Sequence, residues 1–163
     1  PPIGNDRVKV AEDIKARQQL AEEGKVSEII IHAEGGTTNG TMCQFKKGAF
    51  AALLSVRPKA VRYNNFNIGV NPGSGILDGF AHHMMVLSNY FTVLEVSEMP
   101  TLGPTIFLEE SLAEGEEKWQ TYARVIRDII SEGGNIPIGK HEDGSECDIK
   151  EKQEYKELIW PKK

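Results

Sequence analysis

The sequence is poor in cysteine and has no long apolar run. Its 163 residues include two cysteines, Cys43 and Cys147, which form no Cys-x-x-Cys pair and have no histidines at zinc-finger spacing. These absences exclude a disulfide scaffold and a structural zinc site, so we expect no metal and a reducing compartment. No apolar run approaches the about 18 residues that cross a bilayer, and residues 1–4 do not resemble a signal peptide.

Acidic residues are missing from one long stretch. Asp and Glu outnumber Lys and Arg by 24 to 19 overall, yet neither acid occurs between residues 35 and 77. The basic residues of that stretch are Lys46, Lys47, Arg57, Lys59 and Arg62. A local basic segment in an acidic protein indicates an anionic ligand such as a phosphate or a lipid headgroup, or simply a solvated basic face. We expect no nucleic acid partner, because domains that bind nucleic acid are usually basic as a whole.

The patterns along the chain predict one domain, residues 1–163, of the α/β class. With 39% hydrophobic and 26% charged residues, the composition is that of a globular protein. Hydrophobic periodicity and turn residues predict alternating helices and strands. The expected helices cover residues 5–23, 49–54, 80–91, 116–132 and 148–160, and the expected strands cover residues 28–32, 56–63 and 92–97. Residues 64–79 are rich in Asn and Gly and are expected to form a loop.

Residues 28–32 and the segments after them predict a phosphate site. The three consecutive isoleucines are typical of a strand that is covered on both faces in a parallel sheet. Glycines at a strand end let backbone N–H groups approach an oxyanion, and threonine hydroxyls and lysines at a helix start add donors and positive charge. No Walker A or GxGxxG motif is present. The expected phosphate-binding residues are Glu34, Gly35, Gly36, Thr37, Thr38, Lys46, Lys47 and Gly48.

The residues around this site resemble the phospholipid/glycerol acyltransferase family, and within it the lysophospholipid acyltransferases. The family's Phe-Pro-Glu-Gly-Thr block is similar to residues 32–36, and its Phe-Lys-x-Gly-Ala-Phe block is similar to residues 45–50. A third block, Val-x-Pro-Val, resembles residues 56–61. The resemblance extends more weakly over most of the chain. It implies the C-terminal portion of an acyltransferase-like domain, with a mixed or parallel sheet flanked by helices.

The resemblance implies acyl transfer from acyl-CoA, as a co-substrate and not a bound cofactor, to the hydroxyl of a lysophospholipid. In the family a His-x-x-x-x-Asp motif supplies the base, and the Glu-Gly-Thr block helps to bind the acceptor phosphate. None of the four histidines in this sequence has an Asp five positions later. We therefore predict no catalytic residue in this chain and expect the chain alone to be inactive.

Two functions remain open. The chain is either the C-terminal portion of an active enzyme, whose catalytic His and Asp precede Pro1, or a non-catalytic scaffold subunit of a membrane-associated complex. Both imply an intracellular location on the reducing side, peripheral to the endoplasmic reticulum or a mitochondrial membrane. The expected partners are a lysophospholipid or other anionic lipid headgroup, the membrane surface, and a complementary N-terminal half or partner subunit. Without that complement, we expect the isoleucine strand to be uncovered and the chain to aggregate.

Three histidines and one apolar segment allow more than one interpretation. His32 follows the isoleucines and could be a base, but the family has an aromatic residue there, which favours a packed, hydrogen-bonded histidine. His82 and His83 are adjacent, so they point to different faces of a helix and disfavour a metal site. The apolar residues around them, including Phe80 and Phe91, fit either core packing or contact with a membrane.

Overall fold

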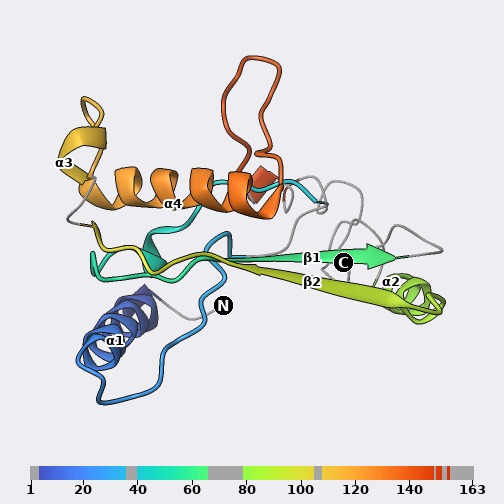
Figure 1. Ribbon diagram of the computed structural model, residues 1–163, viewed down its shortest axis with the longest axis horizontal. Coiled ribbons are helices and arrows are strands. Elements are labelled where there is room, and N and C mark those ends of the chain that lie inside the picture. Colours follow the sequence, from blue (N-terminus) through green and yellow to red (C-terminus); the bar gives the residue numbers. More distant parts are fainter. Residues whose placement is uncertain are drawn as a thin grey trace.

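The computed structural model describes residues 4–35, 40–65, 79–104, 108–148, 150–151 and 154. In chain order its helices and strands are α1 (Gly4–Glu22), the 3-10 helix η1 (Lys47–Ala49), β1 (Lys59–Asn65), α2 (Gly79–Leu87), β2 (Thr92–Glu98), α3 (Leu108–Ser111) and α4 (Lys118–Gly134). In Figure 1, α4 runs over the start of β1, and α2 lies at the far end of both strands. No helix in the described segments is long and apolar enough to cross a membrane.

The helices α1 and α4 confirm the sequence prediction to within two residues at each end. At the start of α4, Gln120 accepts a hydrogen bond of 2.8 Å from the backbone N–H of Glu117, which satisfies a donor that the helix leaves unpaired. Asn135 ends α4 in the left-handed conformation, with φ 49° and ψ 47°. The helix therefore ends just after Gly134, two residues beyond the predicted end. Gly134 also allows close packing, because a Cβ there would lie 2.4 Å from the Cβ of Ala60 on β1.

The core lies between α4 and the segments that precede β1. Its buried residues are Met42, Phe45, Phe50, Tyr122, Ala123 and Ile126. Tyr122 is 0% exposed, and its hydroxyl lies 2.8 Å from the carbonyl oxygen of Leu54 and 3.0 Å from that of Leu102. The rings of Phe50 and Tyr122 meet edge to face, with centroids 5.5 Å apart. The phenol of α4 thus joins two loop segments that are far apart in the sequence.

The strands β1 and β2 form an antiparallel pair. Lys59 lies opposite Glu98 at one end, and Asn65 lies opposite Thr92 at the other. This confirms the predicted strand at 92–97 and most of that at 56–63. The first strand begins after Pro58, which has no N–H to donate to a ladder, although its carbonyl accepts the N–H of Met99 at 3.0 Å.

Two predicted elements are wrong. Residues 28–32 form no strand, because no other described segment pairs with them, and Ile30 is 87% exposed. The helix expected at 49–54 is reduced to η1 and a turn, and Leu53 has a φ of 50° that a helix does not allow. The ladder that the structure describes is antiparallel. The mixed or parallel sheet of an α/β domain stays a prediction.

Other predicted elements fall partly outside the described residues. Residues 66–78 of the loop predicted at 64–79 are outside the described residues. Most of the tail helix predicted at 148–160 is outside them as well. The helix predicted at 80–91 corresponds to α2, which ends at Leu87. At the start of the tail, the side chain of Glu151 accepts the backbone N–H of Asp148 at 3.3 Å, the pairing expected at a helix start.

Candidate functional site

The two sequence blocks predicted to bind phosphate lie side by side. The backbone N–H of Lys46 donates to the carbonyl of Ala33 at 2.7 Å. Gly35, with a φ of +75°, closes a tight turn in which its N–H donates to the carbonyl of His32. A Cβ on Gly35 would lie 3.6 Å from Cγ of Lys46. We call residues 32–35 and 45–48 the cradle.

The structure describes part of the predicted phosphate site. Glu34, Gly35, Lys46, Lys47 and Gly48 belong to the cradle, whereas Gly36, Thr37 and Thr38 lie outside the described residues. The carboxylate of Glu34 accepts the backbone N–H of Cys43 at 3.2 Å. It therefore ties residue 34 to the segment that leads into the second block, a positioning role that the sequence did not predict.

Lys46 is paired with an acid from the tail of the chain. Its Nζ lies 2.5 Å from Oδ1 of Asp148, and both side chains are partly buried. The hydrogen bond from Lys46 holds the pKa of Asp148 below its usual range, helped by the backbone N–H of Lys150. Asp148 is therefore a carboxylate at neutral pH, and an anion that binds Lys46 must compete with it.

Lys47 is held more loosely at the start of α4. Its Nζ lies 3.2 Å from Oε2 of Glu117 and 5.5 Å from the centre of the Trp119 ring. The indole N–H of Trp119 donates to the same carboxylate oxygen at 2.7 Å, and this bond, followed by that of Lys47, lowers the pKa of Glu117. Exposed pairs of this kind contribute little to stability, so Lys47 can exchange its partner at small cost.

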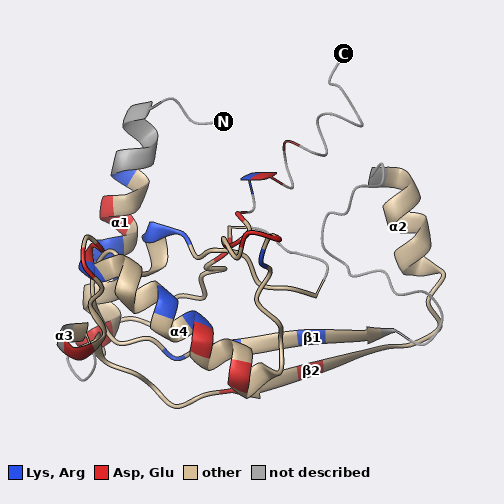
Figure 2. Ribbon diagram, turned by 90° about the horizontal axis from the view of Figure 1, so that it is seen from above, with Lys and Arg blue, Asp and Glu red and all other residues tan. Residues whose placement is uncertain are grey.

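The other basic residues of the acid-free stretch also lie close to acids. The nitrogens of Arg57 and Lys59 are 3.0 and 2.7 Å from the two carboxylate oxygens of Glu98. The Lys59 hydrogen bond and the two positive charges lower the pKa of Glu98. Arg62 lies opposite Glu95 in the strand pair, where Figure 2 shows basic and acidic bands facing each other. Acids from later segments thus balance a stretch that is basic in the sequence.

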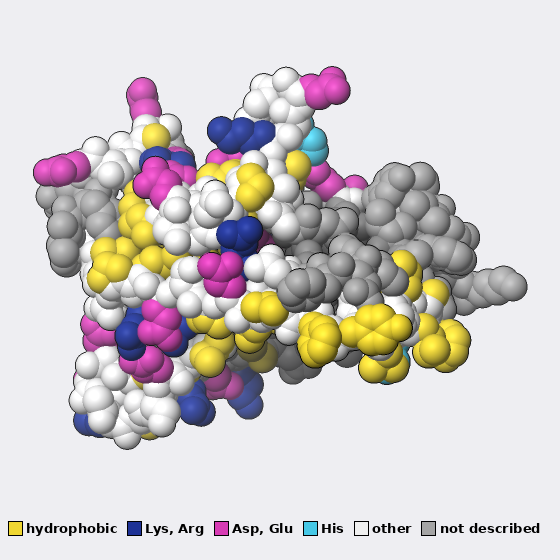
Figure 3. Space-filling model, turned by 45° about the vertical axis from the view of Figure 1, so that its right-hand side comes forward, with side chains coloured by type: hydrophobic (Ala, Val, Ile, Leu, Met, Phe, Trp, Pro, Cys, Tyr) yellow, Lys and Arg dark blue, Asp and Glu magenta, His cyan; other side chains and the backbone are white. Residues whose placement is uncertain are grey.

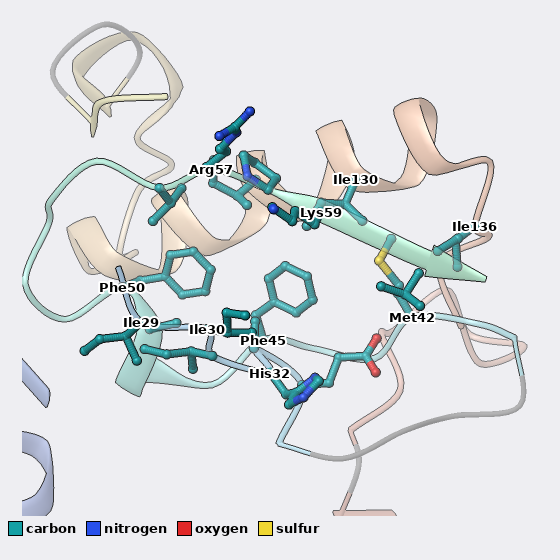
Figure 4. Close-up of a pocket in the computed structure, with 18 of the residues that line it drawn as sticks. Ile29, Ile30, His32, Met42, Phe45, Phe50, Arg57, Lys59, Ile130 and Ile136 are labelled. Carbon is teal, nitrogen blue, oxygen red and sulfur yellow. The ribbon is translucent and has the colours of Figure 1, made fainter. Parts of the chain in front are cut away.

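A groove of about 1010 Å³ adjoins the cradle. Its apolar lining includes Ile29, Ile30, Phe45, Phe50, Ile130 and Ile136. In Figure 4 the rings of Phe45 and Phe50 lie between the two isoleucines on one side and Arg57 and Lys59 on the other. Sequence reasoning missed this groove because its walls come from distant segments. The one signal available was the apolar run at residues 29–31.

His32 differs from its prediction. Its side chain is exposed at the edge of the groove, so the interpretation as a packed residue is wrong. The reason is the same as for Ile30, because no described segment pairs with residues 28–32. On α2, His82 is partly buried and His83 is exposed, which agrees with the expectation that they point to different faces.

Comparisons with known proteins support the resemblance seen in the sequence. Over 105 residues, 62% of this chain, it is 30% identical to lysophospholipid acyltransferase LPCAT4 of Xenopus tropicalis, of which the match covers 19%. Over 119 residues, 72% of this chain, it is 31% identical to lysophosphatidylcholine acyltransferase 2B of Mus musculus, of which the match covers 22%. The chain thus spans about a fifth of the length of the curated relatives it matches.

No family model matches the chain, and no solved structure matches it. The support therefore comes from two acyltransferases that are similar over well over half of this chain. This similarity relates the chain to the lysophospholipid acyltransferases.

Proposed function

We propose that this chain forms the acceptor-binding part of a lysophospholipid acyltransferase-like protein. The cradle binds the phosphate of a lysophospholipid, and the groove beside it takes the apolar part of the same molecule. The hydrogen bond of 2.7 Å from Lys46 to Ala33 carries this proposal, because it joins the two blocks that resemble the family.

Phosphate binding rests on the two adjacent lysines of the cradle. Their carboxylate partners, Asp148 and Glu117, belong to the later part of the chain. The pair of Lys47 is exposed and that of Lys46 is only partly buried, and an exposed ion pair is worth only about 0–1 kcal/mol. A phosphate group, which accepts hydrogen bonds from several donors at once, can therefore replace these carboxylates.

The groove fits an acyl chain. The isoleucine and phenylalanine side chains of its lining are apolar, and it opens directly beside the cradle. Each methylene group moved from water into such a groove gains about 0.8 kcal/mol. A lysophospholipid presents its phosphate and its acyl chain at opposite ends of one small molecule, which matches a charged cradle beside an apolar groove.

Acyl transfer needs a general base, and this sequence lacks the motif that supplies the base in the resembling family. Because the sequence has no His-x-x-x-x-Asp motif, we expect no acyl-CoA-dependent turnover by the chain alone. A missing general base costs typically 10²- to 10⁴-fold in rate. Turnover by the purified chain that is abolished in His32→Ala would contradict this proposal and would make the exposed His32 the base.

The proposed location of the chain is the surface of an intracellular membrane, to which it binds peripherally. The helix α2 carries no Lys, Arg, Asp or Glu, as its tan ribbon in Figure 2 illustrates. Phe80 and Phe91 are 75% and 71% exposed, and Figure 3 shows apolar side chains gathered at this end of the molecule. Aromatic and methionine side chains suit the interface of a bilayer.

A second candidate is a non-catalytic scaffold subunit. The observation that favours it is the exposure of Ile30 beside an open groove, a surface that a complementary N-terminal half or a partner protein would cover. The two candidates differ in activity. The native protein, in the longest form in which it occurs, is assayed with acyl-CoA and a lysophospholipid. Turnover supports the enzyme, and no turnover supports the scaffold.

The binding proposal is tested with vesicles that contain lysophosphatidic acid. The double variant Lys46→Glu and Lys47→Glu should weaken salt-sensitive binding more than the matched reversal Lys59→Glu and Arg62→Glu, although both change the net charge equally. Equal losses from the two pairs would contradict a defined site and would reduce the basic segment to a diffuse surface charge.

A further inference from the structure

Residues 139–147 form a hairpin with a well-defined backbone. The N–H of Cys147 donates to the carbonyl of Gly139 at 3.0 Å, and the N–H of His141 donates to that of Ser145 at 2.8 Å. Asp143 accepts the backbone N–H of Ser145 at 2.9 Å and closes the turn. Figure 1 shows this hairpin as the orange-red loop that stands over the end of α4.

The pairing of the hairpin fixes which side chains share a face. Lys140 lies opposite Glu146, so these two side chains share one face, while His141 and Cys147 share the other. Glu146 forms a two-pronged ion pair with Arg127 of α4, one arm of which is 2.5 Å long. Arg127 is buried, so this pair holds the first face against the helix. His141 and Cys147 remain together on the second face.

The tail brings a third side chain to His141 and Cys147. Oε2 of Glu151 lies 2.8 Å from Nε2 of His141, while its other oxygen accepts the backbone N–H of Asp148. One ligand atom from each of His141, Cys147 and Glu151 lies within 4.8 Å of the other two. Ligands around a tetrahedral zinc ion are about 3.3–3.6 Å apart, given zinc bond lengths of about 2.0–2.3 Å. Small side-chain rotations therefore suffice to surround one ion.

We propose that His141, Cys147 and Glu151 bind a zinc ion. An imidazole nitrogen, a thiolate sulfur and a carboxylate oxygen form a donor set that suits Zn²⁺, whereas Mg²⁺ and Ca²⁺ prefer oxygen alone. Three protein ligands leave the fourth tetrahedral position for water. The ion fastens the tail at Glu151 to the hairpin and, through Arg127, to α4.

The sequence did not predict this site, and its expectation of no metal rested on spacing alone. His141 and Cys147 are six positions apart, which is not a zinc-finger spacing. The hairpin register brings them to one face, and the turn at Asp148 returns Glu151 to them. The site is therefore visible only after the chain has folded.

Titration of the full chain with Zn²⁺ and with Co²⁺ tests the proposal. We expect one ion per chain, a thiolate-to-cobalt charge-transfer band, and no competition from excess Mg²⁺. Each of three single variants should weaken Zn²⁺ binding at least about tenfold: His141→Ala, Cys147→Ser and Glu151→Gln. Loss of a residue that only hydrogen-bonds to a metal ligand already costs about 10- to 100-fold in metal affinity. The matched controls His83→Ala, Cys43→Ser and Glu154→Gln should bind as the unaltered chain does.

The unaltered chain alone can overturn the proposal, whatever the variants do to folding. Absence of saturable Zn²⁺ binding, or a cobalt spectrum without a thiolate band, contradicts it. Binding that survives in a folded Cys147→Ser variant, or that is lost in a folded Cys43→Ser variant, assigns the metal to other residues and contradicts it as well. Neither result bears on phosphate binding by the cradle, which vesicle binding measures separately.

Discussion

The side of the molecule built on α4 and the side built on α2 use apolar residues in opposite ways. On α4, Tyr122 is 0% exposed and lies in a core that loop segments complete. Beside α2, Tyr90 is 82% exposed. The helix α4 is polar on one face and apolar on the other, whereas α2 has no charged residue and is apolar apart from its two adjacent histidines. The apolar side chains of the α4 side are thus buried within the chain, whereas those of the α2 side are exposed.

The largest expected effect compares the two tyrosines directly. Tyr122→Ala should destabilise the chain by about 3–5 kcal/mol, because it empties the core and removes the hydroxyl that lies against the two loop carbonyls. The matched change Tyr90→Ala should alter stability by about 0.5 kcal/mol or less, because that ring is exposed. Urea denaturation measures both. Similar losses for the two variants would show that the α2 side is packed as tightly as the core.

A medium effect concerns the contact between α4 and β1. Gly134→Ala should destabilise the chain by about 1–3 kcal/mol, since its Cβ would collide with that of Ala60. Gly48→Ala is the matched control, because a Cβ there meets no atom within 4 Å. Thermal unfolding of the two variants gives the comparison. A Gly134→Ala chain as stable as the unaltered one would mean that helix and strand are less closely packed than described.

The smallest effect is electrostatic and depends on pH. Hydrogen bonds from Arg124 and then Thr121 hold the pKa of Glu116, just before α4, below its ordinary value of 4.5. A lowered pKa stabilises the fold above pH 4.5, and this contribution is lost as the pH falls through the folded-state pKa. Glu116→Gln should therefore cost at most about 1 kcal/mol at pH 7 and progressively less below pH 4.5. Urea unfolding at several pH values checks this, and a cost that does not change with pH would contradict it.

Local patterns in the sequence were enough to predict α1, α4, most of α2 and the two strands, but not the antiparallel pairing of those strands. Helical spacing of the apolar residues Trp119, Tyr122 and Ile126 predicted α4. The pattern of residues 92–97 predicted β2 with nearly correct ends. The strand predicted at residues 28–32 is wrong because a strand needs a neighbouring strand to pair with, and no described segment pairs with these residues. The apolar composition of that segment predicted a covered strand. The expectation that the isoleucines lack a cover came from the family resemblance, and Ile30 is exposed.

The site was predictable only in part, for a different reason. The blocks at residues 32–36 and 45–50 lie close together in the sequence, so their meeting could be expected. Lys46 and Asp148 are 102 positions apart, and no local pattern predicts that an acid from the tail reaches the cradle. The same holds for the groove, whose lining extends from residue 18 to residue 137.

The most direct test of the account is vesicle binding after release of the cradle lysine. Asp148→Asn frees Lys46, so binding to vesicles with lysophosphatidic acid should strengthen up to about fivefold, the equivalent of an ion pair of up to about 1 kcal/mol. Glu98→Gln, which frees Arg57 and Lys59 by the same change in charge, should strengthen binding less. If Glu98→Gln strengthens binding as much as Asp148→Asn does, the phosphate is not bound at the cradle.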